Sequence, residues 1–96
     1  MRSADPDVAL LSALADPVRL SIVRQLAASD GICACDFTEC CNVSQPTISH
    51  HLKVLREAGV LVSRRQGTNI VYSLAPNLAR RWAGIGASIS GLVQVA

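Results

Sequence analysis

Apolar residues recur at helical spacing along the first quarter of the chain. They form two stripes, at Val8, Leu11 and Leu14 and then at Val18, Ile22 and Leu26. Each stripe follows an Asp-Pro pair, Asp5-Pro6 or Asp16-Pro17, in which the carboxylate can cap a helix and the proline suits its first turn. The pattern therefore predicts two helices, the second of which ends at Asp30-Gly31.

The next segment predicts two helices separated by a tight turn. A short helix is expected over about residues 34–41, with Cys33 at its N-cap. Ser44 can cap a longer helix that runs from residue 45 to about residue 58, where Gly59 would stop it. Two helices joined by so short a turn form a helix-turn-helix.

The remainder of the chain predicts a hairpin and a final helix. Two runs that favour strands, 61–65 and 70–74, flank the turn-forming sequence 66–69. A last helix is expected from residue 77 to about residue 93. The order α-α-α-α-β-β-α describes a mainly α fold with a small β-hairpin, a winged helix-turn-helix. Its 96 residues suit one domain, so we expect residues 1–96 to form a single unit.

The helix expected over residues 45–58 has two distinct faces. Ile48, Leu52 and Leu55 share one apolar stripe. The polar side carries amide, hydroxyl, imidazole and cationic groups, which can read base edges or neutralise phosphates. With two arginines of the hairpin, the candidate DNA-binding residues are Gln45, Thr47, Ser49, His50, Lys53, Arg56, Arg64 and Arg65. The alternative is a solvated helix face beside a strand edge protected by charge. His51 flanks the apolar stripe, so we expect it to be packed and hydrogen-bonded rather than a metal ligand.

Composition and charge support an anionic partner and a subunit interface. Half of the residues are hydrophobic and only 17% are charged, an apolar excess that a subunit interface would bury. The three aromatic residues are too few for a platform that stacks single-stranded bases. Residues 1–41 carry three arginines against six acidic residues, whereas residues 42–81 carry six basic residues against one glutamate. The basic middle segment therefore indicates an anionic partner such as DNA.

The chain shows no signal for a membrane or for export. Its longest uncharged run, residues 82–96, is shorter than the roughly 18–20 residues of a membrane span. The N-terminal residues lack the pattern of a secretory signal. We therefore expect a cytoplasmic protein without a membrane partner, in which the cysteines are reduced thiols.

The four cysteines, Cys33, Cys35, Cys40 and Cys41, are candidate metal ligands. Thiolates select soft ions such as As(III), Sb(III), Hg(II), Cd(II) or Zn(II). Only four residues separate the two pairs, so two or three thiolates suit the spacing better than a closed tetrahedral site. Cys33 and Cys35 are the first candidates, because a helix N-terminus favours thiolate. The third ligand remains open between Cys40 and a second subunit, and Cys41 can equally be a small buried residue.

Three stretches resemble the ArsR/SmtB family of metal-responsive winged-helix repressors, over about residues 8–80. They are 14–20, 44–55 and 59–61, the last followed by Arg64-Arg65. The resemblance implies a homodimer built from the first and last helices, which binds a pseudo-palindromic operator and is released by metal. Arsenic-responsive members carry Cys-x-Cys-Asp-x-Cys. Residues 33–36 match this motif, whereas Thr38 stands at the third cysteine position. The family's zinc site on the last helix uses His and acidic residues, which residues 76–96 lack, so that site is not expected here.

The prediction is thus a homodimeric repressor that is not an enzyme. It binds double-stranded operator DNA without a cofactor, and a soft ion that binds near Cys33 and Cys35 releases it. As(III) or Sb(III) is the preferred inducer, and Hg(II) or Cd(II) is the alternative. A thiol redox-sensing repressor is a further alternative. A small thiol oxidoreductase or arsenate reductase is the rival from another class, although the chain has no Cys-x-x-Cys on a βαβ unit and no phosphate-binding loop.

Two expectations concern assembly and switching. The last helix combines small residues that permit close approach with an apolar stripe: Gly84, Gly86, Ala87, Ser88 and Gly91, and Ile85, Ile89 and Leu92. We expect this helix and the first one to form a two-fold interface. Metal binding is expected to distort the start of the short helix over residues 34–41. Its Phe37 and Cys41 would pack toward Ile48 and Leu52, and so pass the strain to the DNA-reading helix.

Overall fold

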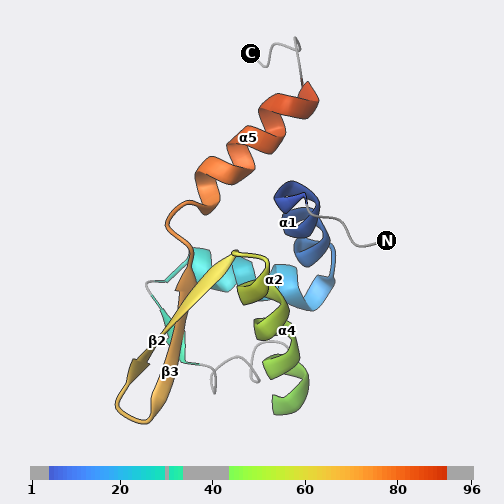
Figure 1. Cartoon of the computed structure of the whole chain (residues 1–96). Helices are drawn as coiled ribbons and strands as arrows, with labels where there is room; N and C mark the ends of the chain where they lie inside the picture. Colours follow the sequence, from blue (N-terminus) through green and yellow to red (C-terminus); the bar gives the residue numbers. More distant parts are fainter. Residues whose placement is uncertain (1–4, 30, 34–43, 91–96) are drawn as a thin grey trace.

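The computed structural model describes residues 5–29, 31–33 and 44–90, and Figure 1 shows their arrangement. The helices of this part are α1 (Pro6–Leu14), α2 (Pro17–Ala27), α4 (Gln45–Glu57) and α5 (Leu78–Ser90). Its strands are β1 (Ile32–Cys33), β2 (Leu61–Gln66) and β3 (Asn69–Leu74). The short helix expected over residues 34–41 lies outside the described residues, as does the expected end of the last helix.

The two Asp-Pro helix starts are confirmed. Asp5 Oδ1 accepts a hydrogen bond from the backbone N–H of Asp7 at 2.9 Å. Asp16 Oδ2 accepts from the N–H groups of Val18 and Arg19, both at 3.0 Å. The expected end of the second helix is wrong, however, because α2 stops at Ala27 rather than at Asp30-Gly31. The chain leaves the helix early since residues 32 and 33 are extended and pair with β3.

The sheet has a third strand that the hydrophobic pattern did not predict. Its order is β1-β3-β2, with both pairs antiparallel. β1 pairs Ile32 with Tyr72 and Cys33 with Val71. Cys33 therefore lies on a strand, while the helix for which it is the expected N-cap lies outside the described residues. Two residues are too few for a period-2 pattern, and what makes them a strand is a partner far along the chain.

The hairpin is tighter than expected. β2 and β3 stay in register from Leu61 opposite Leu74 to Gln66 opposite Asn69, so only two residues form the turn instead of four. Gly67 has φ +63° there, a left-handed conformation that glycine adopts without steric cost.

The core draws side chains from all four helices and from β2. Its buried residues are Leu10, Ala13, Ile22, Leu26, Ile48, Leu52, Leu55, Val60, Leu61 and Ile85. The apolar stripes expected on α2 and α4 are thereby confirmed, because their residues lie in the core or pack against it. On α1 the choice of face differs, because Leu10 and Ala13 are buried whereas Val8 and Leu11 are 48% and 43% exposed. α1 is apolar on nearly every side, so its sequence periodicity could not decide which side faces the core.

None of the helices in the described ranges is long and apolar enough to cross a membrane.

Candidate nucleic-acid interface

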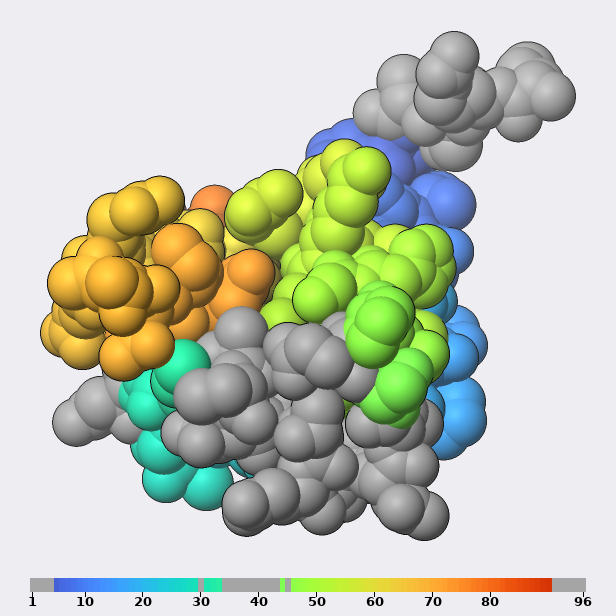
Figure 2. Space-filling model, turned by 90° about the horizontal axis from the view of Figure 1, so that it is seen from below, coloured from blue at the N-terminus to red at the C-terminus, as the bar shows by residue number. Residues whose placement is uncertain are grey.

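The two faces of α4 are separated in the structure as its sequence predicts. Ile48, Leu52 and Leu55 are at most 1% exposed. The exposed predicted residues of this helix are Thr47, Ser49, His50, Lys53 and Arg56, while the side chain of Gln45 lies outside the described part. Figure 2 shows α4 in green beside the yellow-to-orange hairpin on one face of the molecule. The structure thus brings a polar helix face and the hairpin together on one side.

A hydrogen-bonded junction to α2 holds the middle of α4. Arg19 donates from one terminal guanidinium nitrogen to His51 Nδ1 at 3.2 Å and from Nε to the Ala13 carbonyl oxygen at 2.6 Å. Because arginine only donates, Nδ1 is the accepting nitrogen of the ring. The His51 side chain is 12% exposed, and its Nδ1 lies 3.9 Å from Asp16 Oδ2. The prediction that His51 is packed and hydrogen-bonded is therefore confirmed.

Asp16 is the acidic member of this junction. The backbone N–H of Arg19, which donates to the carboxylate, lowers the pKa of Asp16, and the Arg19 and His51 side chains lower it further, against a raising effect of desolvation. The helix start and the side chains of Arg19 and His51 thus stabilise the charged form of the carboxylate.

The start of α4 is capped differently from the expectation. Ser44 has an extended N-cap conformation, but its hydroxyl makes no capping bond to the backbone. Instead Ser44 Oγ and Thr47 Oγ1 lie 3.0 Å apart and share a hydrogen bond. The Ser44 carbonyl oxygen still accepts from the N–H of Ile48 at 3.0 Å, so the helix begins at the predicted residue.

The two arginines of the hairpin lie on β2 and are exposed. Arg64 is opposite Val71, which is opposite Cys33 on β1, so the three residues form one row across the sheet. Residues directly opposite each other in antiparallel strands project from the same face. A Cβ placed on Gly31 would lie 2.9 Å from Val71 Cγ1 and 3.8 Å from an Arg64 guanidinium nitrogen. Arg64 therefore reaches across the sheet toward β1. We call Cys33, Val71 and Arg64 the cross-strand row.

The thiol site can be placed only in part. Cys33 is half-buried on β1, and Cys35, Cys40 and Cys41 lie outside the described residues. Among the residues that the structure describes, no group of three His, Cys, Asp or Glu side chains could hold a metal ion. Whether the four cysteines come together thus stays a prediction.

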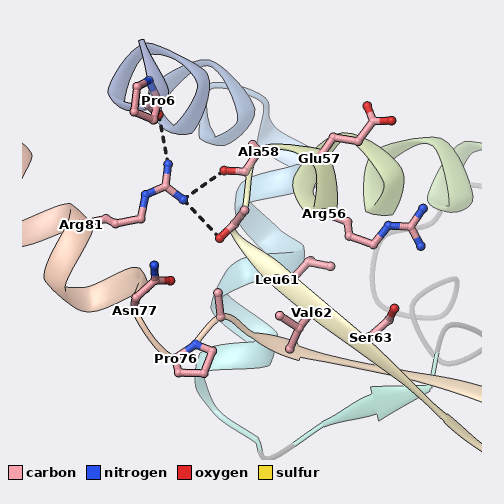
Figure 3. Close-up of a pocket in the computed structure, with 12 residues that line it drawn as sticks. Pro6, Arg56, Glu57, Ala58, Leu61, Val62, Ser63, Pro76, Asn77 and Arg81 are labelled. Carbon is pink, nitrogen blue, oxygen red and sulfur yellow. Dashed lines mark hydrogen bonds between the residues drawn. The ribbon is translucent and has the colours of Figure 1, made fainter. Parts of the chain in front are cut away.

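Arg81 is a residue whose role the sequence did not reveal. It lines an open hollow of about 700 Å³, and Figure 3 shows its guanidinium pointing at the end of α4 and at α1. One nitrogen donates to the carbonyl oxygens of Ala58 and Gly59, at 3.0 and 3.2 Å, and the other donates to that of Pro6 at 3.0 Å. We call these three bonds the Arg81 bridge. In the sequence, Arg80 and Arg81 are two equal charges, and no local pattern tells them apart.

Comparison with known proteins gives consistent results. The model of a helix-turn-helix domain matches residues 14–64. The arsenical resistance operon repressor of Escherichia coli strain K12 is 42% identical over 76 residues, which cover 79% of this chain and 64% of that protein. The transcriptional repressor SmtB homolog of a Synechocystis strain is 44% identical over 66 residues, covering 69% and 49%. The chain thus spans from about half to just under two-thirds of the length of these relatives.

A solved structure confirms the fold. The crystal structure of a possible transcriptional regulator for arsenical resistance superposes with a TM-score of 0.76 at 27% identity, covering 85% of this chain and 84% of the other. The predicted winged helix-turn-helix is therefore the fold of this chain, with β1 as an addition to the expected hairpin.

Proposed function

The chain belongs to the ArsR/SmtB family of winged-helix transcriptional regulators, and from this premise we propose that it is a homodimeric, metal-responsive repressor. The members of this family bind DNA and are not enzymes, which leaves the rival of a thiol oxidoreductase or arsenate reductase without support. We place the action of this repressor in the cytoplasm, on operator DNA.

One observation carries the DNA-binding part of the proposal. Ser49, His50, Lys53 and Arg56 project from α4 on the side opposite the core, beside the exposed Arg64 and Arg65 of the hairpin. A helix of this kind fits the major groove, where hydroxyl and imidazole groups reach base edges, while lysine and arginine neutralise phosphates. The hairpin arginines would contact the neighbouring sugar-phosphate backbone of the DNA.

The affinity of Lys53→Ala at several salt concentrations tests this part. Loss of one phosphate contact should weaken binding to duplex DNA and reduce the slope of log K against log salt by about one unit. Arg80→Ala removes the same charge from the exposed side of α5, away from α4, and should leave the slope unchanged. If the two variants behave alike, or if Lys53→Ala keeps the wild-type slope, this face of α4 does not contact DNA.

Thiols carry the metal-responsive part. We propose that Cys33 and Cys35 bind the inducer, with a further thiol from Cys40 or Cys41 or from the second subunit. Thiolate ligands suit soft ions, and a relative of this chain is a repressor of an arsenical resistance operon, which supports As(III) or Sb(III) as inducer. Hg(II) or Cd(II) is the alternative, because two thiolates suffice for linear Hg(II).

The cross-strand row supports a route from the thiols to DNA that differs from the expected one. Cys33 lies in register with Val71, and Val71 with Arg64, so an ion that pulls on the Cys33 thiol would act on β1 and through β3 on the hairpin. This route does not require the helix expected over residues 34–41 to carry the strain. By linkage, DNA must weaken metal binding by the same factor by which metal weakens DNA binding.

Metal titration of a protein–DNA complex tests this part. As(III), Hg(II), Cd(II) and Zn(II) are added separately to the wild type and to the Cys33→Ser, Cys35→Ser and Cys40→Ser variants. Cys33→Ser and Cys35→Ser should bind DNA like the wild type but fail to leave it, and Cys40→Ser decides whether Cys40 is the third ligand. If both of the first two variants still dissociate normally, the metal site lies elsewhere. Release by peroxide without metal would instead favour a redox repressor.

Exposed apolar residues support the homodimer. Val8 and Leu11 of α1 and Trp82 and Ile89 of α5 are between 43% and 80% exposed. Trp82 also borders an apolar groove of about 440 Å³ between α2, α5 and the end of β3. A second copy that covers α1 and α5 would bury these surfaces, as the resemblance implies.

A further inference from the structure

The Arg81 bridge meets α4 at the end where helix carbonyl groups lack partners. Ala58 is the C-cap of α4, and Gly59 follows it with φ +77°. The last carbonyl groups of a helix carry partial negative charge, which a cation stabilises. α4 has a basic residue of its own in the last turn, Arg56, but the hydrogen bonds to the Ala58 and Gly59 carbonyl oxygens come from α5, more than 20 residues later.

The same side chain also holds the first turn of α1. Its second terminal nitrogen donates to the Pro6 carbonyl oxygen at 3.0 Å, and Figure 3 shows the guanidinium between this oxygen and the end of α4. A planar guanidinium presents donors in a fixed fork, so it can bond in both directions at once, whereas the single nitrogen of lysine cannot reproduce that geometry.

The two elements proposed to contact DNA, α4 and the hairpin, meet at this point of the chain. The N–H of Val60, the residue after Gly59, donates to the Leu55 carbonyl oxygen, and the Val60 carbonyl oxygen accepts from Ala75 at the end of β3. β2 begins at the next residue. The Arg81 bridge thus ties the common base of α4 and the hairpin to α1 and α5.

We propose that Arg81 is a positioning residue that sets the angle of the recognition helix α4 against the dimer-forming helices α1 and α5. The inference rests on the proposed dimer and its operator. In such a dimer the two copies of α4 must lie one turn of DNA apart, about 34 Å. α4 has 13 residues and is about 20 Å long, so a tilt of about 10° at its C-terminal end would move its first turn by about 3.5 Å. Loss of the bridge would therefore spoil simultaneous contact with two half-sites, and not the contact with one.

The test compares one half-site with two. The probes are a pseudo-palindromic duplex, selected by the wild-type protein from a random-sequence pool, and the same duplex with one half-site scrambled. The variants are Arg81→Gln and Arg81→Lys, and Arg80→Gln is the matched control, because it removes the same charge from the adjacent exposed residue. Sedimentation and thermal melting are recorded for each protein.

We expect Arg81→Gln to remain dimeric and to lose about 10- to 100-fold in affinity for two half-sites, while its half-site affinity stays within about twofold of that of Arg80→Gln. Arg81→Lys should lose affinity in the same direction, and it provides the measurement if Arg81→Gln does not fold. An equal loss on both probes, a loss matched by Arg80→Gln, or a monomeric Arg81→Lys would overturn the inference. If the wild type itself shows no preference for two half-sites, the proposed function fails instead, whatever Arg81 does.

Discussion

Asp16 caps the start of α2 and, at the same time, faces α4. Its carboxylate accepts the two N–H bonds that start α2, and it lies 3.9 Å from the His51 ring on α4. Arg19 completes the junction, since its guanidinium bonds both His51 and the end of α1. At this scale a capping residue and the arginine beside it together link three helices.

Replacing Asp16 by Asn should give a stability difference that depends on pH. The pKa of Asp16 is lowered from its ordinary value of 3.8, so its charged form contributes stability above that value and loses the contribution as pH falls through the folded-state pKa. Asn can still cap the helix but carries no charge. Urea unfolding between pH 7 and pH 3 should therefore show a difference in the free energy of unfolding between wild type and variant, and this difference should close at the acid end. A gap that is constant over this range would show that the charge is irrelevant.

Substitutions at two glycines with left-handed backbone conformations can distinguish the cost of backbone strain from the cost of a side-chain clash. Gly59 and Gly67 have φ of +77° and +63°. A Cβ at Gly67 would touch nothing within 4 Å, whereas a Cβ at Gly59 would lie 2.9 Å from an Arg81 nitrogen. Gly67→Ala should lower the free energy of unfolding by about 1–2 kcal/mol, because of the left-handed conformation alone. Gly59→Ala should cost more and should also reproduce the half-site behaviour of Arg81→Gln. Equal free energies of unfolding for the two variants would mean that Arg81 moves aside freely.

At the scale of elements, α4 divides two tasks between neighbouring residues. Leu52 is 1% exposed and packs in the core, while Lys53 projects on the outer side. The sheet also has two faces, because Ile32, Leu61, Tyr72 and Leu74 pack against the core, while the cross-strand row with its buried Val71 lies on the other face. On α4, packing and the proposed DNA contacts are thus carried by opposite faces of one helix.

Substitutions one residue apart on α4 should therefore have separable effects. Leu52→Ala should lower the free energy of unfolding by about 2–5 kcal/mol, as the loss of a buried leucine commonly does. Lys53→Ala should leave that energy within about 0.5 kcal/mol of wild type, because it is an exposed substitution. Measured under conditions where both are folded, only Lys53→Ala should change the salt dependence of DNA binding. A destabilised Lys53→Ala would show that its side chain also supports the fold.

At the scale of the whole molecule, one protomer is more extended than a compact domain. The radius of gyration of the Cα atoms is 14.6 Å, against about 12.5 Å expected for a compact chain of this length. Figure 1 shows α5 rising away from the sheet. An exposed helix that carries Trp82 and Ile89 is an expected feature of a chain that completes its core with a second copy.

Ile89→Glu should prevent that assembly. Ile89 is 80% exposed in the protomer, so the substitution should leave the protomer folded while placing a charge in the proposed interface. Sedimentation at micromolar concentration should then report a monomer. Val62→Glu is the control, since Val62 is an exposed apolar residue of β2 and belongs to neither α1 nor α5, and it should remain dimeric. A wild-type chain that sediments as a monomer, or a dimeric Ile89→Glu, would exclude this interface.

The sequence by itself determined the features that depend on neighbouring residues. The Asp-Pro helix starts, the two faces of α4 and the glycine in the hairpin turn follow from capping, periodicity and backbone sterics, all of which act within a few residues. The polar face of α4 was therefore predictable, and so was the packed position of His51.

Only the tertiary structure decided the features that need a distant partner. β1 exists because β3 pairs with it, and this pairing places Cys33 in the cross-strand row. The apolar residues of α1 could face the core on either side, and packing against the other helices chose Leu10 and Ala13. Arg81 differs from Arg80 only because α4 ends within reach of its guanidinium. In each case the decisive energy comes from contacts between segments far apart in the chain, which no local pattern encodes.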